Sequence, residues 1–403
     1  MHDLAPLLLS LAALIIGTKL MGDLAQRLGQ PAVLGELLAG VLLGPSVLAL
    51  VSPDDSVLKA FAELGVLILL FEIGLHTDVK SLRRVGGRAT TVAIVGVVAP
   101  FVGGFYAASW VGFNHIESLV AGAALTATSI GISARVLMDI GRLDTDEGQI
   151  VLGAAVLDDL IGLIILTVVS ELVAGGGITA IGVVRTSGLA LGFVAIALAV
   201  GSFAVPPIFR VVERLQSTGA LGLIALAFAL VMATVAEVSG SAMIVGALAA
   251  GLVLHSTPQR PDIERSITQL GYLFVPIFFA VIGASVDLRA LSDPRALKVG
   301  ALLTVVGIGG KLISGFALRK FEGSRLLIGV AMIPRGEVGL IFAQVGLTTG
   351  AIAAGEFGAI MLMVVATTLI TPPWLSALTR TKAPRASTGV FDGLADLVGG
   401  VRK

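Results

Sequence analysis

The chain has 403 residues, of which 56% are hydrophobic and only 13% are charged, with 27 basic and 27 acidic side chains. Soluble domains carry about a quarter charged residues, so this composition indicates membrane helices, in which the 51 glycines are also expected. The balanced charge gives no sign of nucleic-acid binding, and the absence of cysteine excludes disulfides, thiolate nucleophiles and cysteine-type metal sites.

A spanning helix needs about 20 mostly apolar residues, and polar or Gly/Pro positions divide the chain into about thirteen such segments. The predicted spans, in chain order, are 4–27, 32–51, 56–76, 88–111, 117–138, 147–173, 178–209, 219–237, 241–256, 266–286, 296–317, 325–349 and 357–379. No small-x-small cleavage site interrupts the start, so we expect a first transmembrane helix there and not a signal peptide. Residues 1–380 are predicted as a single transmembrane unit and 381–403 as a short cytoplasmic tail.

Basic residues are spread unevenly over the predicted loops, and this asymmetry predicts the orientation in the membrane. One side holds Arg27, Lys80, Arg83, Arg84, Arg88, Arg142, Arg210, Arg214, Arg260, Arg265, Arg319, Lys320, Arg325 and the basic residues of the tail. The other side holds only Lys59, Arg185, Arg289, Arg295 and Lys298. The richer side is cytoplasmic, so we expect the N-terminus outside and the C-terminus in the cytoplasm.

Six predicted spans precede the long seventh and six follow it, so the two halves would be inverted repeats. The fifth span of each half is interrupted by polar and helix-weakening residues: 124–134 reads ALTATSIGISA and 330–340 reads VAMIPRGEVGL. Interrupted segments at matching positions indicate a transporter site, because unwound backbone at membrane depth is tolerated only where it lines a cavity. Ordinary close packing of small residues is the alternative for either segment alone.

Asp158 and Asp159 lie near the middle of the predicted sixth span. An ionisable residue at the bilayer centre costs roughly 2.5–3.5 kcal/mol, so few are kept there without use. The two carboxylates point about 100° apart on a helix and face different neighbours while sharing one local field. A carboxylate that holds either a proton or a cation, but not both, can exchange the two. A purely structural Asp pair is the alternative, although one Asp would suffice for a salt bridge.

Lys311 lies deep in the predicted eleventh span, among glycines that allow another helix to approach. A buried lysine needs a carboxylate partner, and Asp158 is the candidate; a static ion pair and a lysine that releases its proton during a cycle both remain open. Arg335 and Glu337 lie in the second interrupted segment, where they could pair with each other or with Glu72 of the third span. Because arginine does not deprotonate in practice, we interpret Arg335 as structural.

Other titratable groups receive simpler interpretations. Glu36, at the cytoplasmic end of the second span, is interpreted as a solvated helix-end carboxylate, with attraction of cations as the alternative. His76 and His255 lie on the cytoplasmic side, where pH sensing and plain solvation are both open. The sequence has no P-loop, no HExxH zinc motif and no TVGYG filter, so neither an ATP-driven pump, a zinc enzyme nor a potassium channel is indicated.

Four motifs, residues 30–45, 127–136, 153–159 and 334–340, make the sequence similar to the cation/proton antiporter superfamily, in particular its NapA/NhaA-like sodium/proton antiporters. The resemblance runs from the first span to about residue 380. It implies an all-α, NhaA-like fold with six-helix inverted repeats joined by a linker helix and two crossed broken helices. It also implies a dimerisation scaffold, a six-helix core that includes 117–173 and 296–379, and a homodimer in a bacterial inner membrane.

The same resemblance implies roles for individual residues. Asp159 would be the main ion- and proton-carrying carboxylate, Asp158 would exchange its partner Lys311 for the cation, and Thr128 and Ser129 would line the site. The implied function is secondary active exchange of Na+ (or Li+) for H+ by alternating access, without a cofactor and in the service of pH homeostasis. Electrogenic exchange is implied because the Asp pair resembles the electrogenic branch.

Two alternatives stay open at the level of sequence. One is a K+/H+ antiporter, and the other is a sodium-coupled organic-anion symporter of similar fold, which would need a roomy pocket and no obligatory proton coupling. Glu72 departs from the pattern, because the resemblance leads us to expect an apolar residue at that position.

Overall fold

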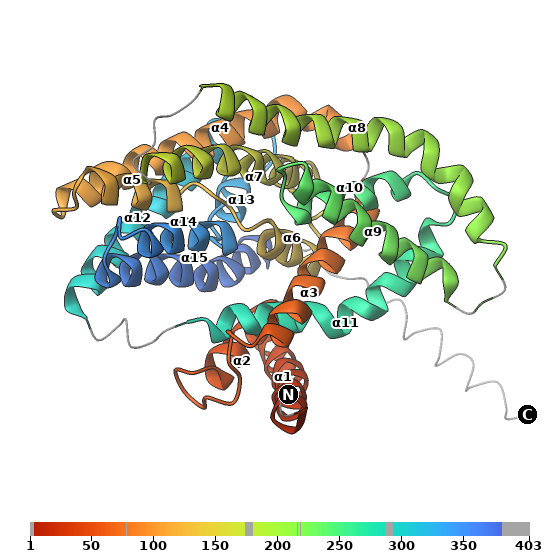
Figure 1. Cartoon of the computed structure of the whole chain (residues 1–403), viewed down its shortest axis with the longest axis horizontal. Helices are drawn as coiled ribbons and strands as arrows, with labels where there is room; N and C mark the ends of the chain where they lie inside the picture. Colours follow the sequence, from red (N-terminus) through yellow and green to blue (C-terminus); the bar gives the residue numbers. More distant parts are fainter. Residues whose placement is uncertain are drawn as a thin grey trace, which may run out of the picture.

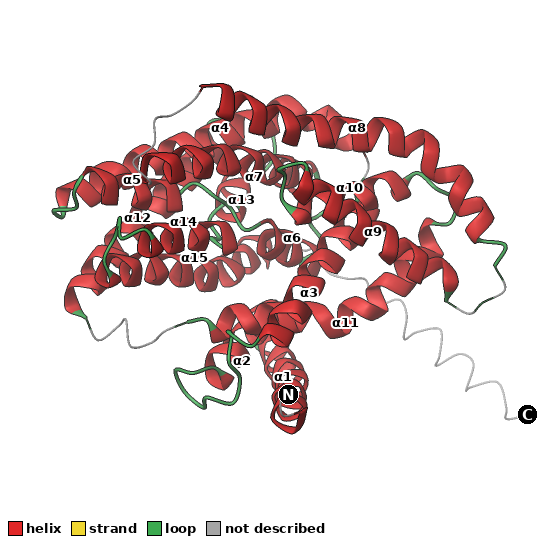
Figure 2. Cartoon of the chain, viewed as in Figure 1, coloured by secondary structure: helices red, strands yellow, loops and turns green. Residues whose placement is uncertain are grey.

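The computed structural model describes residues 4–77, 79–173, 180–215, 217, 219–286 and 293–380. Within these ranges the regular structure is helical (Figures 1 and 2). The helices are α1 (Leu4–Arg27), α2 (Ala32–Leu43), α3 (Ser56–His76), α4 (Val79–Trp110), α5 (His115–Ala124), α6 (Ile130–Asp139), α7 (Asp146–Val173), α8 (Ala180–Val212), α9 (Ala220–Val238), α10 (Met243–His255), α11 (Arg260–Ala284), α12 (Pro294–Phe316), α13 (Arg325–Ala331), α14 (Glu337–Thr348) and α15 (Ala354–Arg380). The predicted tail, 381–403, lies outside the described residues.

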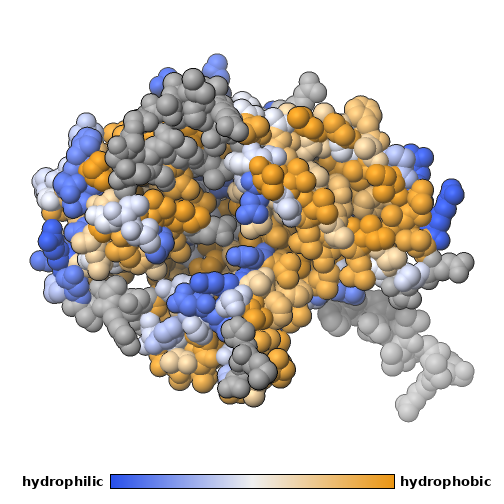
Figure 3. All heavy atoms as spheres, in the orientation of Figure 1, coloured by the Kyte–Doolittle hydropathy of each residue, from blue (hydrophilic) through white to orange (hydrophobic). Residues whose placement is uncertain are grey.

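The chain is an all-helical, multi-pass membrane protein. In the described part, seven helices are long and apolar enough to cross a membrane, or eight if one bent pair counts as a single span. Large apolar side chains are exposed on their outer faces, as on α1, where Leu4 and Leu9 are 66% exposed. Hydrophobic residues cover most of the face seen in Figure 3. Such a surface fits lipid and not water.

Most predicted spans overlap one observed helix to within a few residues, and two differ for physical reasons. The span predicted over 32–51 was wrong at its end, because α2 stops at Leu43 before Gly44 and Pro45. Proline cannot donate to a helix and disfavours helical backbone at the preceding residue. The span predicted from residue 88 begins at Val79, because the charged stretch that hydropathy left out continues the same helix.

Both interrupted segments consist of two short helices joined by irregular backbone. Residues 125–129 separate α5 from α6, and residues 332–336 separate α13 from α14. The two irregular stretches contact each other: the Ser129 N–H donates to the Pro334 carbonyl over 2.8 Å, and the Ser133 hydroxyl donates to the Ala331 carbonyl. Backbone groups freed by one break are thus partly satisfied by the other, as burial in a membrane protein requires.

The helices pack in two groups, seen on the left and on the right and bottom of Figure 1. In the core group, α4 packs on α5, α7 and α12, and α15 packs on α12 and α14. In the scaffold group, α3 packs on α10 and α11, and α2 packs on α1 and α11. We use "core group" for α4–α7 and α12–α15, and "scaffold group" for α1–α3 and α8–α11. Helix α6 contacts α7 on one side and α2 and α3 on the other, so it lies on the boundary.

Candidate ion-binding site

Asp158 of α7 and Lys311 of α12 form an ion pair inside the core group. Lys311 Nζ donates to Asp158 Oδ2 over 2.6 Å, and both side chains are 0% exposed. Thr128, in the break after α5, donates its hydroxyl to the same oxygen over 2.7 Å. A buried pair is tolerable only with good geometry and additional hydrogen bonds, and Asp158 Oδ2 has both. Asp158 Oδ1 has no hydrogen-bond partner among the described residues, so this oxygen can accept another donor or a cation.

Glycines on two helices make room for the buried ammonium group. A Cβ placed at Gly96 of α4 would lie 3.4 Å from Lys311 Nζ, and one placed at Gly310 of α12 would lie 2.8 Å from the backbone of Pro100. The helices α4 and α12 therefore approach closely at this depth. The glycines beside Lys311 can be recognised in the sequence, whereas Gly96 cannot, because its position becomes meaningful only once α4 and α12 are known to pack together.

Asp159, the next residue of α7, faces a small pocket on the boundary between the two groups. It is 3% exposed and lines the pocket together with Thr128, Ser129 and Gly336 from the two breaks. The opposite wall is apolar and comes from the scaffold group, with Val66, Ile244 and Phe278. The pocket thus presents a carboxylate and two hydroxyls on its core wall and hydrocarbon on its scaffold wall.

The groups around this pocket suit a small hard cation or a proton. Carboxylate, hydroxyl and carbonyl oxygens are the ligands that such cations prefer, and the two breaks place hydroxyls and irregular backbone beside Asp159. Within the described ranges, no group of three or more His, Cys, Asp or Glu side chains is arranged so that it could hold a metal ion.

Arg335 lies between the two breaks, where its side chain is 0% exposed. Its Nη1 donates to the Ala127 carbonyl over 3.0 Å, and its own carbonyl accepts from the Thr368 hydroxyl over 2.6 Å. The guanidinium therefore satisfies the Ala127 carbonyl of the first break, and it also donates to the Met332 carbonyl of the second break over 3.5 Å. Backbone carbonyls carry no signal in sequence spacing, so this role could not be predicted from the residue pattern.

Of the two pairings left open for the charges of the second interrupted segment, the one with Glu72 is not found among the described residues. Glu72 lies in the scaffold group, is 5% exposed, and accepts a hydrogen bond from the Thr268 hydroxyl over 2.6 Å. Glu337 begins α14, but its side chain lies outside the described part of the structure, so its pairing with Arg335 stays a prediction. The prediction that Glu36 is solvated was wrong, because this residue is only 4% exposed. The structure thus gathers Asp158, Asp159, Lys311, Thr128 and Ser129, and leaves Glu72 apart from them.

Comparison with known proteins gives a consistent family. The family model described as "Sodium/hydrogen exchanger, transmembrane" matches residues 10–381. The chain is 42% identical to the high-affinity Na(+)/H(+) antiporter NhaS3 of Synechocystis sp., over 93% of this chain and 90% of that protein. It is 35% identical to the Na(+)/H(+)-K(+) antiporter GerN of Bacillus cereus, over 91% of this chain and 94% of that protein.

A solved structure gives the same fold. The sodium proton antiporter MjNhaP1 from Methanocaldococcus jannaschii superimposes with a TM-score of 0.70, covering 94% of this chain and 99% of that chain at 17% identity. At this identity the likeness shows the fold alone.

Proposed function

Since the chain belongs to the transmembrane sodium/hydrogen exchanger family, we propose that it exchanges Na+ (or Li+) for H+ across a bacterial inner membrane at Asp158 and Asp159. Members of this family are transporters and not enzymes, their substrates are Na+ and H+, and they need no cofactor. The proposal is carried by one observation: a fully buried Asp158–Lys311 pair stands directly beside a second buried carboxylate that faces a boundary pocket.

Competition for carboxylate oxygens is the proposed basis of exchange. Asp159 holds either a proton or Na+, with the hydroxyls of Thr128 and Ser129 and nearby backbone carbonyls as further ligands for the cation. A high proton concentration outside displaces Na+, and a high Na+ concentration inside displaces protons. Either occupant neutralises the carboxylate, whereas an empty charged site is costly to carry through an apolar boundary.

Lys311 is the proposed source of electrogenic exchange. When Na+ takes Asp158, the ammonium group loses its carboxylate partner in a fully buried site. An unpaired buried cation is strongly disfavoured, so Lys311 gives up its proton as the cation binds. The cycle then moves more positive charge as protons than it moves as Na+. The free Oδ1 of Asp158 supports this step, because a cation can begin to bind before the ion pair separates.

Alternating access requires the core group to move against the scaffold group. The packing of α4 with α5, α7 and α12 and of α15 with α12 and α14, together with the position of the Asp159 pocket on the boundary, supports such a movement. If α5 with α6 and α13 with α14 each count as one span, the helices correspond to thirteen spans with two crossed breaks in inverted halves. A homodimer formed through the scaffold, an outside N-terminus and a cytoplasmic tail complete the proposal.

The two alternatives differ in their support. Potassium stays a candidate cation, because the name of the relative GerN includes K(+). The organic-anion symporter loses support, because the pocket at Asp159 is small and its apolar wall lies directly against the carboxylate side.

The proposed function is tested with the purified chain in proteoliposomes that contain a pH-sensitive dye. Gradients of Na+, Li+ and K+ are imposed in turn, with and without a membrane potential, and protein-free liposomes serve as the control. We expect Na+ and Li+ gradients to drive proton movement that responds to the potential. If no alkali cation moves protons above the protein-free control, the proposal is wrong.

A further inference from the structure

A second set of charged side chains, of which Glu36 and Glu72 are buried, lies across the boundary between the two groups. Arg135 of α6 has a side chain that is 18% exposed, and its Nε lies 3.1 Å from Asp139 Oδ1 one turn further along the helix. Glu36 of α2 and Glu72 of α3 are 4% and 5% exposed, and both interact electrostatically with Arg135. We call Arg135, Asp139, Glu36 and Glu72 the boundary cluster. Its arginine belongs to the core group and two of its carboxylates belong to the scaffold group.

The carboxylate of Glu36 depends on this arginine more than the carboxylate of Glu72 does. Glu72 is held by the Thr268 hydroxyl, whereas Glu36 Oε2 has no hydrogen-bond partner among the described residues. The other cation that acts on Glu36 is Lys19 of α1, whose Nζ already donates to the Tyr272 carbonyl over 2.8 Å. A buried carboxylate in this position is stabilised chiefly across the boundary, by Arg135.

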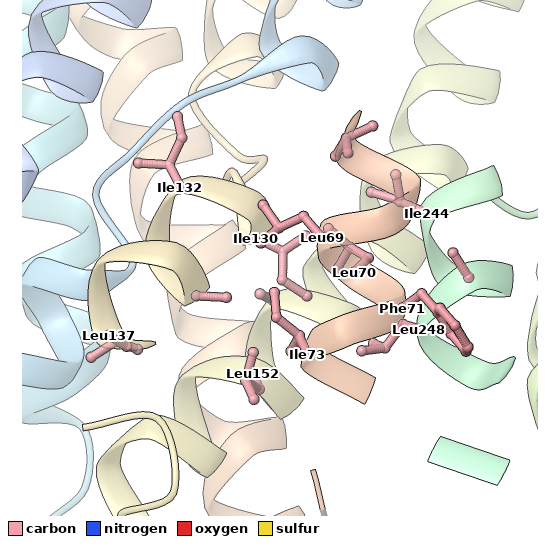
Figure 4. Packing of buried hydrophobic residues seen from close by; sticks show 14 of the residues in the cluster. Leu69, Leu70, Phe71, Ile73, Ile130, Ile132, Leu137, Leu152, Ile244 and Leu248 are labelled. Carbon is pink, nitrogen blue, oxygen red and sulfur yellow. The ribbon is translucent and has the colours of Figure 1, made fainter. Parts of the chain in front are cut away.

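The boundary cluster lies where α6 faces the scaffold group. We call this contact surface the seam, and it is otherwise apolar. Arg135 follows Gly131 by four residues, so the two share one face of α6. A Cβ placed at Gly131 would lie 3.7 Å from Leu69 Cδ2 of α3 and 3.6 Å from Phe278 Cε1 of α11, so this face looks at the scaffold group. Figure 4 shows Ile130 of α6 beside Leu69 of α3. Charges within such a seam resist separation, because water does not replace the lost partners until the seam opens.

At the start of α3, the end opposite the boundary cluster, the core group and the scaffold group are separated. A cleft of about 970 Å³ opens there between the start of α3, with Asp54 and Lys59, and the helices α14 and α15, with Gln344 and Met361. About 20 Å of helix α3 separates Lys59 from Glu72. The molecule is therefore open between its groups at one end of α3 and closed at the other, and the boundary cluster lies at the closed end.

We propose that Arg135 is a gating residue: where α6 contacts α2 and α3, its attraction to the carboxylates of Glu36 and Glu72 holds the α6 end of the core group on the scaffold, and these charges must separate before the Asp159 pocket opens to that side. Which ions pass when the seam opens rests on the proposed exchange function. The latch, by which we mean the attraction of Arg135 to Glu36 and Glu72, concerns only the arrangement of the two groups. Removing the guanidinium leaves the two scaffold carboxylates without their partner, so the closed arrangement loses its advantage over the open one.

The chain contains no cysteine, so a single introduced cysteine reports opening of the seam. Ile73, 0% exposed on α3, follows Leu69 by four residues and lies on the same face of the helix. We would measure the rate at which a maleimide labels Ile73→Cys in the purified full chain. We expect Arg135→Gln to raise this rate about tenfold, and Arg135→Lys, which keeps the charge, to raise it much less.

Two controls decide what a faster rate means. Arg142→Gln removes the same charge from the loop after α6 and should leave the rate unchanged. A second reporter, Ala123→Cys, lies in α5 at 0% exposure away from the seam and should stay protected in every variant. Adding Glu36→Gln and Glu72→Gln to Arg135→Gln should change the rate at Ile73→Cys little further, because the partner is already gone.

Three outcomes would overturn the latch: equal rates in Arg135→Gln and Arg142→Gln, equal acceleration at both reporters, or full additivity of the glutamate changes. Equal acceleration at both reporters would assign Arg135 to the stability of the fold. Labelling needs no ion gradient, so it is independent of transport. A chain that moves no Na+ but labels as expected would keep the latch and remove the exchange proposal.

Discussion

Two sets of charged side chains in this molecule differ in where their partners lie. Asp158 and Lys311 both belong to the core group, are 0% exposed and are joined over 2.6 Å. The boundary cluster divides its partners, with Arg135 on the core side and Glu36 on the scaffold side. An ion pair inside one packed group travels with that group and can serve the chemistry of binding. Charges that attract each other across the boundary must separate when the groups move, so they influence the choice between arrangements.

The largest expected effect separates the two sets by activity. Asp159→Asn should abolish Na+-dependent proton flux in proteoliposomes, because the amide can neither bind a proton nor balance the charge of a cation. Asp144→Asn, the same change in the exposed loop before α7, is the matched control and should keep full flux. Asp139→Asn in the boundary cluster should change the rate but keep exchange. Retained flux in Asp159→Asn would contradict the role of Asp159 in exchange.

Stability gives the next largest effect. Lys311→Gln leaves a fully buried carboxylate unpaired and should lower the free energy of unfolding by about 3–5 kcal/mol. Arg135→Gln should lower it less, because that side chain is 18% exposed whereas the Lys311 side chain is 0% exposed. Thermal unfolding in detergent measures both. The double variant Asp158→Asn with Lys311→Gln should recover part of the loss; equal losses in Lys311→Gln and Arg135→Gln would mean that the two sets are alike.

Voltage tests the role of Lys311 more finely. If this lysine releases its proton as Na+ binds, Lys311→Gln should make any remaining exchange much less sensitive to an imposed membrane potential. Arg135→Gln should keep the sensitivity of the parent chain, because arginine stays charged throughout. Flux measured at a series of potentials gives the answer, and unchanged voltage sensitivity in Lys311→Gln would show that this residue carries no transported charge.

The smallest expected effects come from two threonines, each of which donates a hydrogen bond to a buried carboxylate. Thr128→Val removes the hydroxyl from Asp158 and should raise the apparent KM for Na+ about tenfold, the effect of losing one hydrogen bond to a charged group. Thr268→Val removes the hydroxyl from Glu72 and should leave that KM close to the parent value while it speeds labelling of Ile73→Cys. A matching rise in KM for both variants would contradict separate roles.

Helix positions and the two breaks could be predicted because they depend on local composition. Apolar runs show where the helices lie, and the Pro-Arg-Gly sequence at 334–336 marks a stretch that cannot continue a helix without cost. The end of α2 was missed, although Gly44 and Pro45 carry the signal, because hydropathy was given more weight than the effect of proline on its neighbour.

The partners of the charged residues were harder to predict from the sequence, because they depend on packing between distant segments. Lys311 and Asp158 could be paired from the sequence, because each had few other buried charged residues as possible partners. The partners of Arg335 are backbone carbonyls, which no residue pattern reveals. Arg135 lies inside a motif that was noticed for its small polar residues, and Glu36 was assigned to solvent because it stands near a helix end. Only the contact of α6 with α2 and α3 shows that these two charges belong together.

The most direct test of the central claim is the dependence of the apparent KM for Na+ on pH in proteoliposomes. If Na+ and protons compete for Asp158 and Asp159, lower pH leaves fewer free carboxylates, so the KM should rise on the acid side by about tenfold per pH unit for each proton that Na+ displaces, while the maximal rate at saturating Na+ stays constant. A KM that does not change with pH, accompanied by a maximal rate that falls with acid, would mean that protons act elsewhere and would contradict the account.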